Sequence, residues 1–439
     1  MAAIDAYIAG QVAPRGFVGL SFAIVREGVV VLEKGYGQRE LAPDVPVQAD
    51  TAFEIGSISK QFVSALVLQL AQEKKLSIDD PVAKYFPDLT RASDITLHDL
   101  MTHVSGYRDD YPLDFVDREM TQPVTPDESI VRYAGRPLDF EPRTRWSYSS
   151  TGYKILGRVV EKVTGKPLGT ALQERILRPA GMTHSSYMPP AGTPGLARGY
   201  TSFALGPPEP AEPEASGWIY GGGGLDAPAG DIARWDIALM SGKVLGPEAY
   251  RVFTTPRTLA DGRPTIYGCG IVVRASASGE TVLRHGGADS GFVAYSVLVP
   301  RTRSAVVALS NRDYADPRGL VNEIVALLDA ERRSPVPSVA GPPAADVARA
   351  VFAELQSGHV DRGRLGDDFN FFLTDARVQG ASARLGPLGA PTSVVVDDTS
   401  ERGGMEVTTV SFSFAGTKLA ATMFRSADGK VQELLVHKP

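Results

Sequence analysis

The sequence predicts an α+β protein, an α/β sandwich in which an antiparallel sheet is flanked by helices and joined to an all-helical subdomain. Two observations predict this arrangement: strand patterns gather at both ends of residues 1–331, and a helical, loop-rich stretch separates them. A third is the proline-rich stretch 332–344, whose composition is typical of a linker between domains. Residues 345–439 then predict a small C-terminal α+β domain, with one helix against an antiparallel sheet.

The first elements follow from the spacing of their apolar residues. Residues 4–11 predict a short helix, and residues 17–25 and 29–34 predict two strands joined as a hairpin. A longer helix starts near Ser57 and carries a broad apolar face made of Phe62, Val63, Leu66, Val67 and Leu70. Two shorter helices complete the helical middle, at residues 96–103 and 153–163.

Strand patterns return in the second half, after a helix at about 232–239. Four strands are predicted there, at residues 269–274, 281–285, 293–299 and 305–310. The last two form a hairpin, and a helix opens at Pro317. In the C-terminal domain, a helix stopped by Gly358 precedes strands in which apolar residues alternate with Thr and Ser, as in Val410, Phe412 and Phe414.

Composition excludes several classes of partner. The chain has 439 residues and a net charge of −6, with no basic block, so nucleic acid and anionic membranes are not expected as partners. No apolar run is long enough to span a bilayer. The first residues lack the basic and apolar regions of a signal peptide, which predicts a cytoplasmic protein, or a periplasmic or secreted one if a signal peptide has been removed.

Neither a metal nor a cofactor is expected. The single cysteine, Cys269, lies among apolar residues and excludes an internal disulfide. No glycine pattern follows a strand as a dinucleotide site would require. Five histidines lack metal-ligand spacing and are interpreted as structural or surface residues, namely His98, His103, His184, His359 and His437.

A candidate nucleophile opens the long helix. Ser57 follows Gly56, and Lys60 lies one helical turn later over the same face. Burial and the helix N-terminus favour a neutral amine on Lys60, which can take the proton of Ser57. Ser57 could instead be only a helix cap. Against that, this is the only Ser-x-x-Lys in the chain, and a lysine inside an apolar helix is costly without a task.

A run of four glycines occupies positions 221–224. Glycines permit either a close approach of the backbone to a ligand or only a tight turn. The tight turn is slightly favoured.

Two further stretches share a pattern with the first. Residues 145–153 hold the triplet Tyr148-Ser149-Ser150 ahead of a helix, and residues 283–292 hold His285-Gly286-Gly287 between two strands. Together with Ser57 and Lys60, they resemble the motifs of the serine β-lactamase-like superfamily, class C branch. That branch contains class C β-lactamases, DD-carboxypeptidases, D-aminopeptidases and family VIII carboxylesterases. The resemblance covers about residues 3–331, so it implies a β-lactamase-like serine hydrolase domain at 1–331.

The resemblance implies a role for each matching residue. Ser57 resembles the nucleophile and Lys60 the partner that activates it. Tyr148 resembles the tyrosine that carries a proton to the leaving group, although alone it could be a half-buried aromatic residue. The backbone N–H groups of Ser57 and Ala288 correspond to the oxyanion hole.

Two residues of the substrate-binding set Ser150, His285, Gly286 and Gly287 depart from the β-lactamase pattern. Ser150 stands where β-lactam and peptide enzymes usually carry Asn. His285 stands where they carry a lysine, and a histidine at neutral pH is mostly uncharged. Both changes weaken the β-lactamase and DD-carboxypeptidase interpretations. A histidine here is similar to D-aminopeptidases and family VIII esterases.

The expected function is therefore that of a serine hydrolase with an acyl-enzyme intermediate, acting on a small-molecule ester or amide. A carboxylesterase is the leading interpretation. A D-amino-acid peptidase or amidase, or a weak β-lactamase, is the alternative within this class. An alternative of another class is a penicillin-binding or sensor protein that does not turn over. The C-terminal domain could be a lid, a dimerisation surface or a binding module, and a homo-oligomer is left open.

Overall fold

The computed structural model describes residues 1–113, 115–190, 192–276, 279–330 and 336–438. Its contacts divide the chain into two units, Met1–Ala326 and Leu327–Pro439. Each unit has its own cluster of buried apolar side chains. The predicted linker lies partly outside the described residues. Its described part, 336–343, contains neither helix nor strand.

A seven-stranded antiparallel sheet forms the centre of the first unit, in the order β3-β2-β1-β12-β11-β10-β9. Its strands are β1 (Gly19–Arg26), β2 (Val29–Leu41), β3 (Asp44–Pro46), β9 (Val272–Ala275), β10 (Thr281–Asp289), β11 (Phe292–Val299) and β12 (Ser304–Ser310). Every residue of β12 is buried, because both faces of the central sheet are covered. Both predicted hairpins, β1–β2 and β11–β12, are confirmed.

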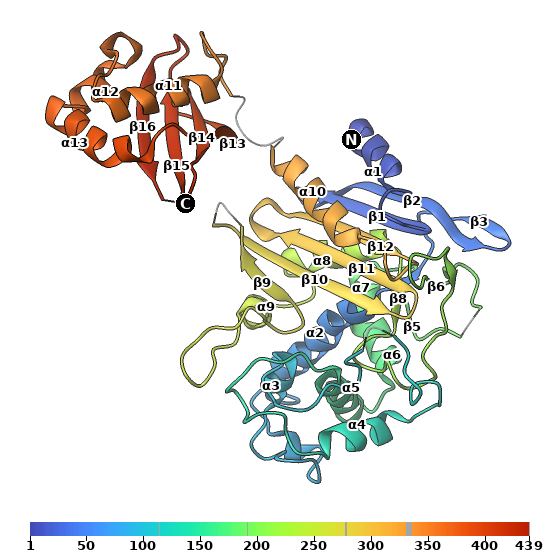
Figure 1. Cartoon of the computed structure of the whole chain (residues 1–439). Coiled ribbons are helices and arrows are strands. Elements are labelled where there is room, and N and C mark those ends of the chain that lie inside the picture. The colour runs from blue at the N-terminus through green and yellow to red at the C-terminus, as the bar shows by residue number, and fades with distance from the viewer. Residues whose placement is uncertain (114, 191, 277–278, 331–335, 439) are drawn as a thin grey trace. The chain divides into compact units, whose positions relative to one another are not determined.

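Helices cover the two faces of this sheet (Figure 1). On one face, α8 (Ala229–Met240) packs against β1, β2 and β12. In Figure 1 it lies behind the sheet, while α10 (Pro317–Ala330) crosses in front. Beside α10 lies α1 (Ala2–Gln11), whose Tyr7 hydroxyl donates a 2.7 Å hydrogen bond to Glu323 of α10. This is the predicted sandwich of helices and sheet.

The helical subdomain surrounds α5 (Ser150–Thr164), which packs against α2 (Ser59–Gln72), α3 (Leu97–Met101) and α4 (Pro126–Ala134). Capping boxes at Thr96 and Thr125 start α3 and α4. Gly165, with φ +68°, ends α5 as predicted. The other helices are α6 (Leu168–Leu172), α7 (Arg178–Ala180) and α9 (Pro247–Thr254), with a π-helical turn at Gln173–Leu177 and a 3-10 turn at Val82–Lys84.

Short strands border this region. A three-stranded sheet has the order β4-β8-β5, with β4 (Phe53–Glu54), β8 (Leu225–Ala227) and β5 (Ser186–Tyr187). β6 (Tyr200–Thr201) pairs with β7 (Glu209–Pro210). β4 leads directly to the 3-10 turn η1 (Gly56–Ile58), so the small sheet fixes the approach of the chain to Ser57.

The second unit is a four-stranded antiparallel sheet, β13 (Ser393–Arg402), β14 (Met405–Ser413), β15 (Lys418–Arg425) and β16 (Val431–His437), in that order. The predicted helix is α11 (Ala344–Ser357), ended by Gly358 at φ +74°. Its Phe352 stacks on Phe412 of β14 at a ring separation of 4.5 Å. Two helices beyond the predicted one also belong to this unit, α12 (Asp367–Phe372) and α13 (Asp375–Leu385).

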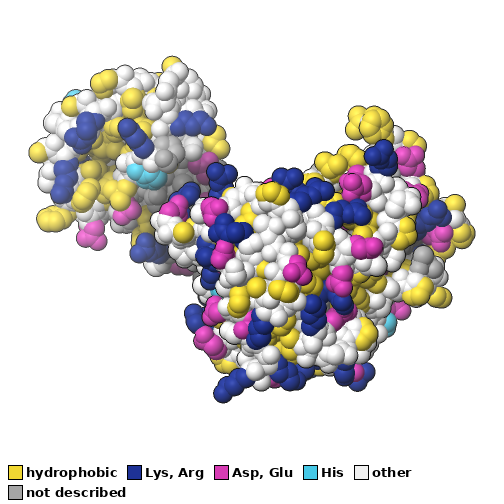
Figure 2. Space-filling model, turned by 90° about the horizontal axis from the view of Figure 1, so that it is seen from below, with side chains coloured by type: hydrophobic (Ala, Val, Ile, Leu, Met, Phe, Trp, Pro, Cys, Tyr) yellow, Lys and Arg dark blue, Asp and Glu magenta, His cyan; other side chains and the backbone are white. Residues whose placement is uncertain are grey.

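The surface carries charges of both signs. Figure 2 shows basic and acidic side chains interspersed over the face seen there, in keeping with the mildly acidic net charge of −6. Within the described ranges, no helix is both long and apolar enough to cross a membrane.

Candidate active site

The candidate nucleophile lies in a tight turn ahead of a buried helix. Gly56, at φ +52°, lets the chain turn from β4 into η1, which carries Ser57 and continues into α2. The cap position of α2 is Ile58, and no side chain caps the helix. The alternative role of Ser57 as a helix cap is therefore wrong, and its hydroxyl is available for another contact.

That contact is Lys60. Its ammonium donates hydrogen bonds to the Ser57 hydroxyl at 2.9 Å and to the Gly222 carbonyl at 2.7 Å. The side chain is almost fully buried, with 1% exposure. No ion pair joins Lys60 to a carboxylate among the residues that the structure describes. A buried lysine held by two neutral oxygens is suited to exchange a proton with the serine.

Tyr148 stands beside this pair. The Lys60 nitrogen lies 4.8 Å from the centre of the Tyr148 ring, within cation–π range. The ring packs against His103 at 4.2 Å and against Tyr267 at 6.3 Å. The Tyr148 hydroxyl is buried and has no hydrogen-bond partner within the described part of the chain. A buried phenol without a partner is costly, which favours a role with a bound substrate.

Two backbone N–H groups meet where β10 passes η1. A methyl group in place of the Gly56 hydrogen would lie 2.6 Å from the nitrogen of Ala288. One on Gly287 would lie 1.9 Å from the Ile55 carbonyl and 3.1 Å from the nitrogen of Ser57. Only glycine permits such contacts. The backbones of Ser57 and Ala288 are thus adjacent, as an oxyanion hole requires.

The edge of β10 is open at this point. β9 pairs with β10 only as far as Arg284, so residues 285–289 have no strand partner on that side among the described residues. Burial alternates along this segment, with Gly286 and Ala288 exposed and His285, Gly287 and Asp289 buried. A substrate can therefore reach the exposed backbone positions of this edge.

The two residues that depart from the β-lactamase pattern have contrasting positions. The backbone N–H of Ser150 donates to Asp109 at 2.8 Å, and its side chain lies near Gly222. The His285 ring is buried: Nδ1 donates to the Gly286 carbonyl at 2.5 Å, and Nε2 accepts from the Tyr267 hydroxyl at 2.6 Å. Burial lowers the pKa of His285 to about 4, so the ring is neutral at physiological pH.

A sequence model of one family, described as Beta-lactamase, matches residues 4–331, which is more than half of the chain. The chain belongs to the beta-lactamase family.

Relatives of this beta-lactamase family member carry two kinds of name. A protein of Bacillus subtilis (strain 168), provisionally named penicillin-binding protein PbpX, is 29% identical over 318 residues, covering 72% of this chain and 76% of that protein. A D-aminopeptidase of Gluconobacter oxydans (strain 621H) is 28% identical over 313 residues, covering 71% of this chain. The match spans 58% of the length of that D-aminopeptidase and 51% of the one from Brucella anthropi.

Solved structures share the fold of this family member. The octameric penicillin-binding protein homologue from Pyrococcus abyssi superposes with a TM-score of 0.66 at 22% identity, over 99% of both chains. The D-amino acid amidase from Ochrobactrum anthropi SV3 superposes with a TM-score of 0.64 at 22% identity, over 75% of this chain and 99% of that chain. The first likeness extends over the C-terminal unit as well.

Several residues near the site in this beta-lactamase family member could not be assigned from the sequence. The glycine run makes the predicted tight turn, with Gly221 at φ +68° and Gly224 at φ +83°. It also makes a close approach, but to Lys60 through the Gly222 carbonyl. His103 was interpreted as structural or surface, and it is buried against Tyr148. The sequence feature that could have pointed to His103 is its position in the stretch 100–106, just before Ser105-Gly106.

Carboxyl groups gather near the close approach of η1 and β10 at Gly56 and Gly287, called the oxyanion turn because it carries the candidate oxyanion hole. Glu54 of β4 lies opposite Asp226 of β8, and Asp289 ends β10. Burial, together with repulsion from Asp226, raises the pKa of Glu54 to about 8. Burial raises the pKa of Asp226 to about 7 and that of Asp289 well above its usual range. Glu54 is therefore mostly protonated at neutral pH, and Asp226 is partly protonated. The described residues contain no cluster suited to a metal ion.

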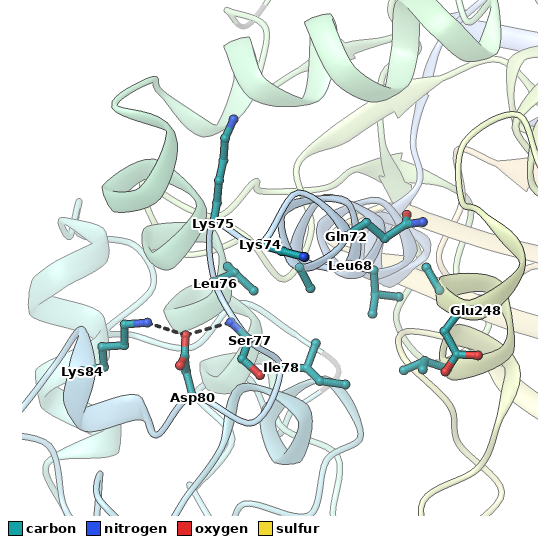
Figure 3. A pocket seen from close by; sticks show the side chains of 13 residues that line it. Leu68, Gln72, Lys74, Lys75, Leu76, Ser77, Ile78, Asp80, Lys84 and Glu248 are labelled. Atoms are coloured by element: carbon teal, nitrogen blue, oxygen red, sulfur yellow. Dashed lines mark hydrogen bonds and ion pairs between the residues drawn. The ribbon is translucent and has the colours of Figure 1, made fainter.

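A separate hollow of about 640 Å³ lies at the far end of α2 (Figure 3). Leu68 and Gln72 of α2, the following loop with Lys74, and Glu248 of α9 contribute to its wall. Lys84 and the backbone of Ser77 bind Asp80 at its rim, at 2.8 and 2.9 Å. None of the predicted site residues lines it, so the candidate chemistry remains at the opposite end of the helix.

Proposed function

We propose that this protein is a serine hydrolase that forms an acyl-enzyme on Ser57 and cleaves small amides of D-amino acids. The 2.9 Å hydrogen bond between Lys60 and Ser57 carries the proposal, because it couples the hydroxyl to a buried amine that has no carboxylate partner in the described chain. The relatives named D-aminopeptidase support the substrate class.

In the proposed acylation, the neutral amine of Lys60 accepts the proton of Ser57 while the serine oxygen bonds to the substrate carbonyl carbon. The negative charge that develops on the carbonyl oxygen is stabilised by the N–H groups of Ser57 and Ala288. Tyr148, beside the Lys60 ammonium, donates a proton to the leaving amine and is reprotonated from Lys60. Water then attacks the ester of Ser57, and the same groups return the proton to the serine.

A carboxylesterase is the second candidate, and two observations favour it. Ser150 offers a shorter side chain than Asn for holding a substrate amide, and the buried, neutral His285 gives no fixed charge for a substrate carboxylate. Simple esters need neither contact, and their leaving groups need less protonation than an amine.

A substrate panel decides between these candidates. It comprises D- and L-amino-acid p-nitroanilides, p-nitrophenyl esters and a chromogenic cephalosporin, each assayed with wild type and Ser57→Ala. We expect turnover of D-amino-acid anilides and esters and poor turnover of the cephalosporin. A fluorophosphonate should label Ser57 alone. Label on another residue contradicts the mechanism, and a burst without turnover on every substrate identifies a penicillin-binding or sensor protein instead.

We also propose that the protein forms a homo-oligomer. The octameric homologue from Pyrococcus abyssi, which covers 99% of this chain, supports self-association. Light scattering coupled to size-exclusion chromatography should give a mass of two or more times the chain mass of 46.8 kDa. A monomeric mass at micromolar concentration contradicts this part of the proposal.

A further inference from the structure

His103 holds the backbone on both sides of Tyr148. Its carbonyl accepts a 3.0 Å hydrogen bond from the N–H of Ser147, and its Nδ1 accepts a 3.1 Å hydrogen bond from the N–H of Ser149. One residue thus ties down both neighbours of the tyrosine. The segment 147–149 otherwise forms neither helix nor strand. These two contacts therefore replace the support that a regular element would give.

The ring of His103 also packs on the tyrosine itself. The two ring centres are 4.2 Å apart, with an angle of 36° between the planes. Tyr267 and Tyr153 lie on other sides of the imidazole, at 4.6 and 5.4 Å. His103 has only 1% exposure, so the Tyr148 ring rests on a rigid, buried surface.

Holding this position is costly, which argues against an incidental contact. His103 adopts φ +59°, a left-handed conformation that residues other than glycine rarely adopt. Because Nδ1 accepts a hydrogen bond, the proton of the neutral ring is on Nε2, and Nε2 is buried without a partner among the residues described. Burial, and next the charge of Lys60, hold the pKa of His103 well below its usual range. The ring therefore stays neutral and can keep its acceptor at Nδ1.

We propose that His103 is a positioning residue that holds the Tyr148 hydroxyl where it can pass a proton to the leaving group. The inference rests on the proposed function, since it assigns His103 a part in the step that Tyr148 performs. Its consequence is selective: substrates with a leaving group that needs a proton depend on His103, and substrates with a stable leaving anion do not.

Two substitutions of His103 separate this role from simple packing. His103→Asn keeps an acceptor near the place of Nδ1 and tolerates the left-handed backbone. His103→Gln places its amide near Nε2 and loses the Nδ1 acceptor. Both remove the ring. Each variant is compared with Tyr148→Phe on two substrates with the same acyl group, a p-nitroanilide and a p-nitrophenyl ester.

For His103→Gln we expect kcat/KM on the anilide, which reports the acylation step, to fall by about 10²-fold, the cost of a misplaced catalytic group, with a much smaller loss of kcat/KM on the ester. His103→Asn should recover part of the anilide activity. Fluorophosphonate labelling of Ser57 should be unchanged, because fluoride leaves without a proton. The double variant His103→Gln/Tyr148→Phe should be no worse than Tyr148→Phe, because the two residues act as a unit.

Equal losses on anilide and ester in both His103 variants, or multiplicative losses in the double variant, would overturn the inference while leaving the role of Tyr148 intact. Equal losses in Tyr148→Phe itself would remove Tyr148 from the proposed mechanism, and the inference would fail with it. If His103→Gln does not fold, His103→Asn provides the test through its ratio of anilide to ester activity. Because this variant keeps an acceptor near the place of Nδ1, a lower ratio is then due to loss of the ring.

Discussion

Two lysines are buried among the described residues of the first unit, and they differ in their partners. Lys60 and Lys154 each have 1% exposure. Lys154, on α5, forms an ion pair with the equally buried Asp110 and donates to the Ser129 hydroxyl at 2.8 Å. In the described chain, Lys60 donates hydrogen bonds to a hydroxyl and a carbonyl and has no carboxylate partner. The Lys154 ammonium is paired with a carboxylate, whereas the Lys60 ammonium is hydrogen-bonded to a serine hydroxyl.

This difference separates a lysine with a structural role from the one proposed to activate the serine. In a buried ion pair, each charge is neutralised by its partner. Removing one member is strongly destabilising, because the other charge is then buried without a partner. A lysine that donates to a serine hydroxyl instead lies within reach of the proton that acylation must remove. Burial alone therefore does not mark a functional lysine, and the partner of the ammonium separates the two.

The largest expected effect is on activity and follows substitution of the unpaired lysine. Lys60→Met should lower kcat by about 10³-fold or more, within the range of positioned acid–base catalysis. Its melting temperature should stay close to that of wild type, because no carboxylate is stranded. Steady-state kinetics and thermal unfolding of the same preparation check both expectations. A large loss of stability with little loss of kcat would place Lys60 in the same class as Lys154.

The next effect is on stability and follows substitution of the paired lysine. Lys154→Met should lower the free energy of unfolding by about 3–5 kcal/mol, because Asp110 is left buried and charged. The folded fraction should keep the wild-type rate of fluorophosphonate labelling. The matched control is Lys154→Met/Asp110→Asn, which removes both charges and should recover most of the loss. If the double variant does not regain this free energy of unfolding, the pair contributes more to stability than the mutual neutralisation of its two charges.

A smaller effect concerns the carboxyl groups near the oxyanion turn. The raised pKa values of Glu54, about 8, and Asp226, about 7, mean that the folded state binds protons that the unfolded state releases above about pH 4. Stability is therefore full below that pH and falls as the pH rises through 7 to 8. The melting temperature should drop by on the order of a few degrees between pH 5 and pH 8.

Asp226→Asn should reduce this pH dependence, since the amide cannot ionise. Thermal unfolding of both proteins across this range checks the expectation. If these carboxyl groups were ionised and paired with cations, as Asp110 is with Lys154, the melting temperature would instead rise with pH. That result would contradict the contrast between the two lysine sites.

The smallest effect on chemistry should come from removing the second unit. A chain that ends near residue 333 should fold, since the first unit has its own core. Its kcat on a p-nitrophenyl ester should match that of the full chain, while its oligomeric state or substrate preference changes. The substrate panel and size-exclusion chromatography measure both. A shortened chain that is the same in every respect would leave the second unit without the roles considered for it.

The sequence was sufficient where contacts are local. Ser57 and Lys60 are three residues apart on one helical path, so their contact could be predicted from spacing. The two hairpins followed from period-two patterns and turns, whereas the order β3-β2-β1-β12-β11-β10-β9 of the sheet was not predicted. The contact of Lys60 with Gly222 joins residues 162 positions apart, and no periodicity carries that information. The contact of His103 with Ser149 spans 46 positions and was missed for the same reason.

Weak patterns account for the two unpredicted helices of the second unit. α12 has six residues and leaves Phe371 87% exposed, so it shows no apolar face. α13 buries only Val378. Lys154 shows the reverse problem: it sits in a helix that was predicted, but its partner Asp110 comes from a loop. A position inside an apolar helix does not distinguish this buried lysine from Lys60, whereas the Ser-x-x-Lys spacing does.

The paired glycines at the oxyanion turn set rules for laboratory evolution of new activities. Any side chain at 56 or 287 would push η1 and β10 apart. A methyl group at 56 would lie 2.6 Å from the nitrogen of Ala288, and one at 287 would lie 1.9 Å from the carbonyl oxygen of Ile55. Those two positions should be held constant in a variant library. The side chain of Ser150 lies near Gly222 and is not among the atoms that a methyl group at 56 or 287 would meet. Diversity placed there can alter which substrates are accepted without moving the N–H groups of Ser57 and Ala288, the proposed oxyanion hole.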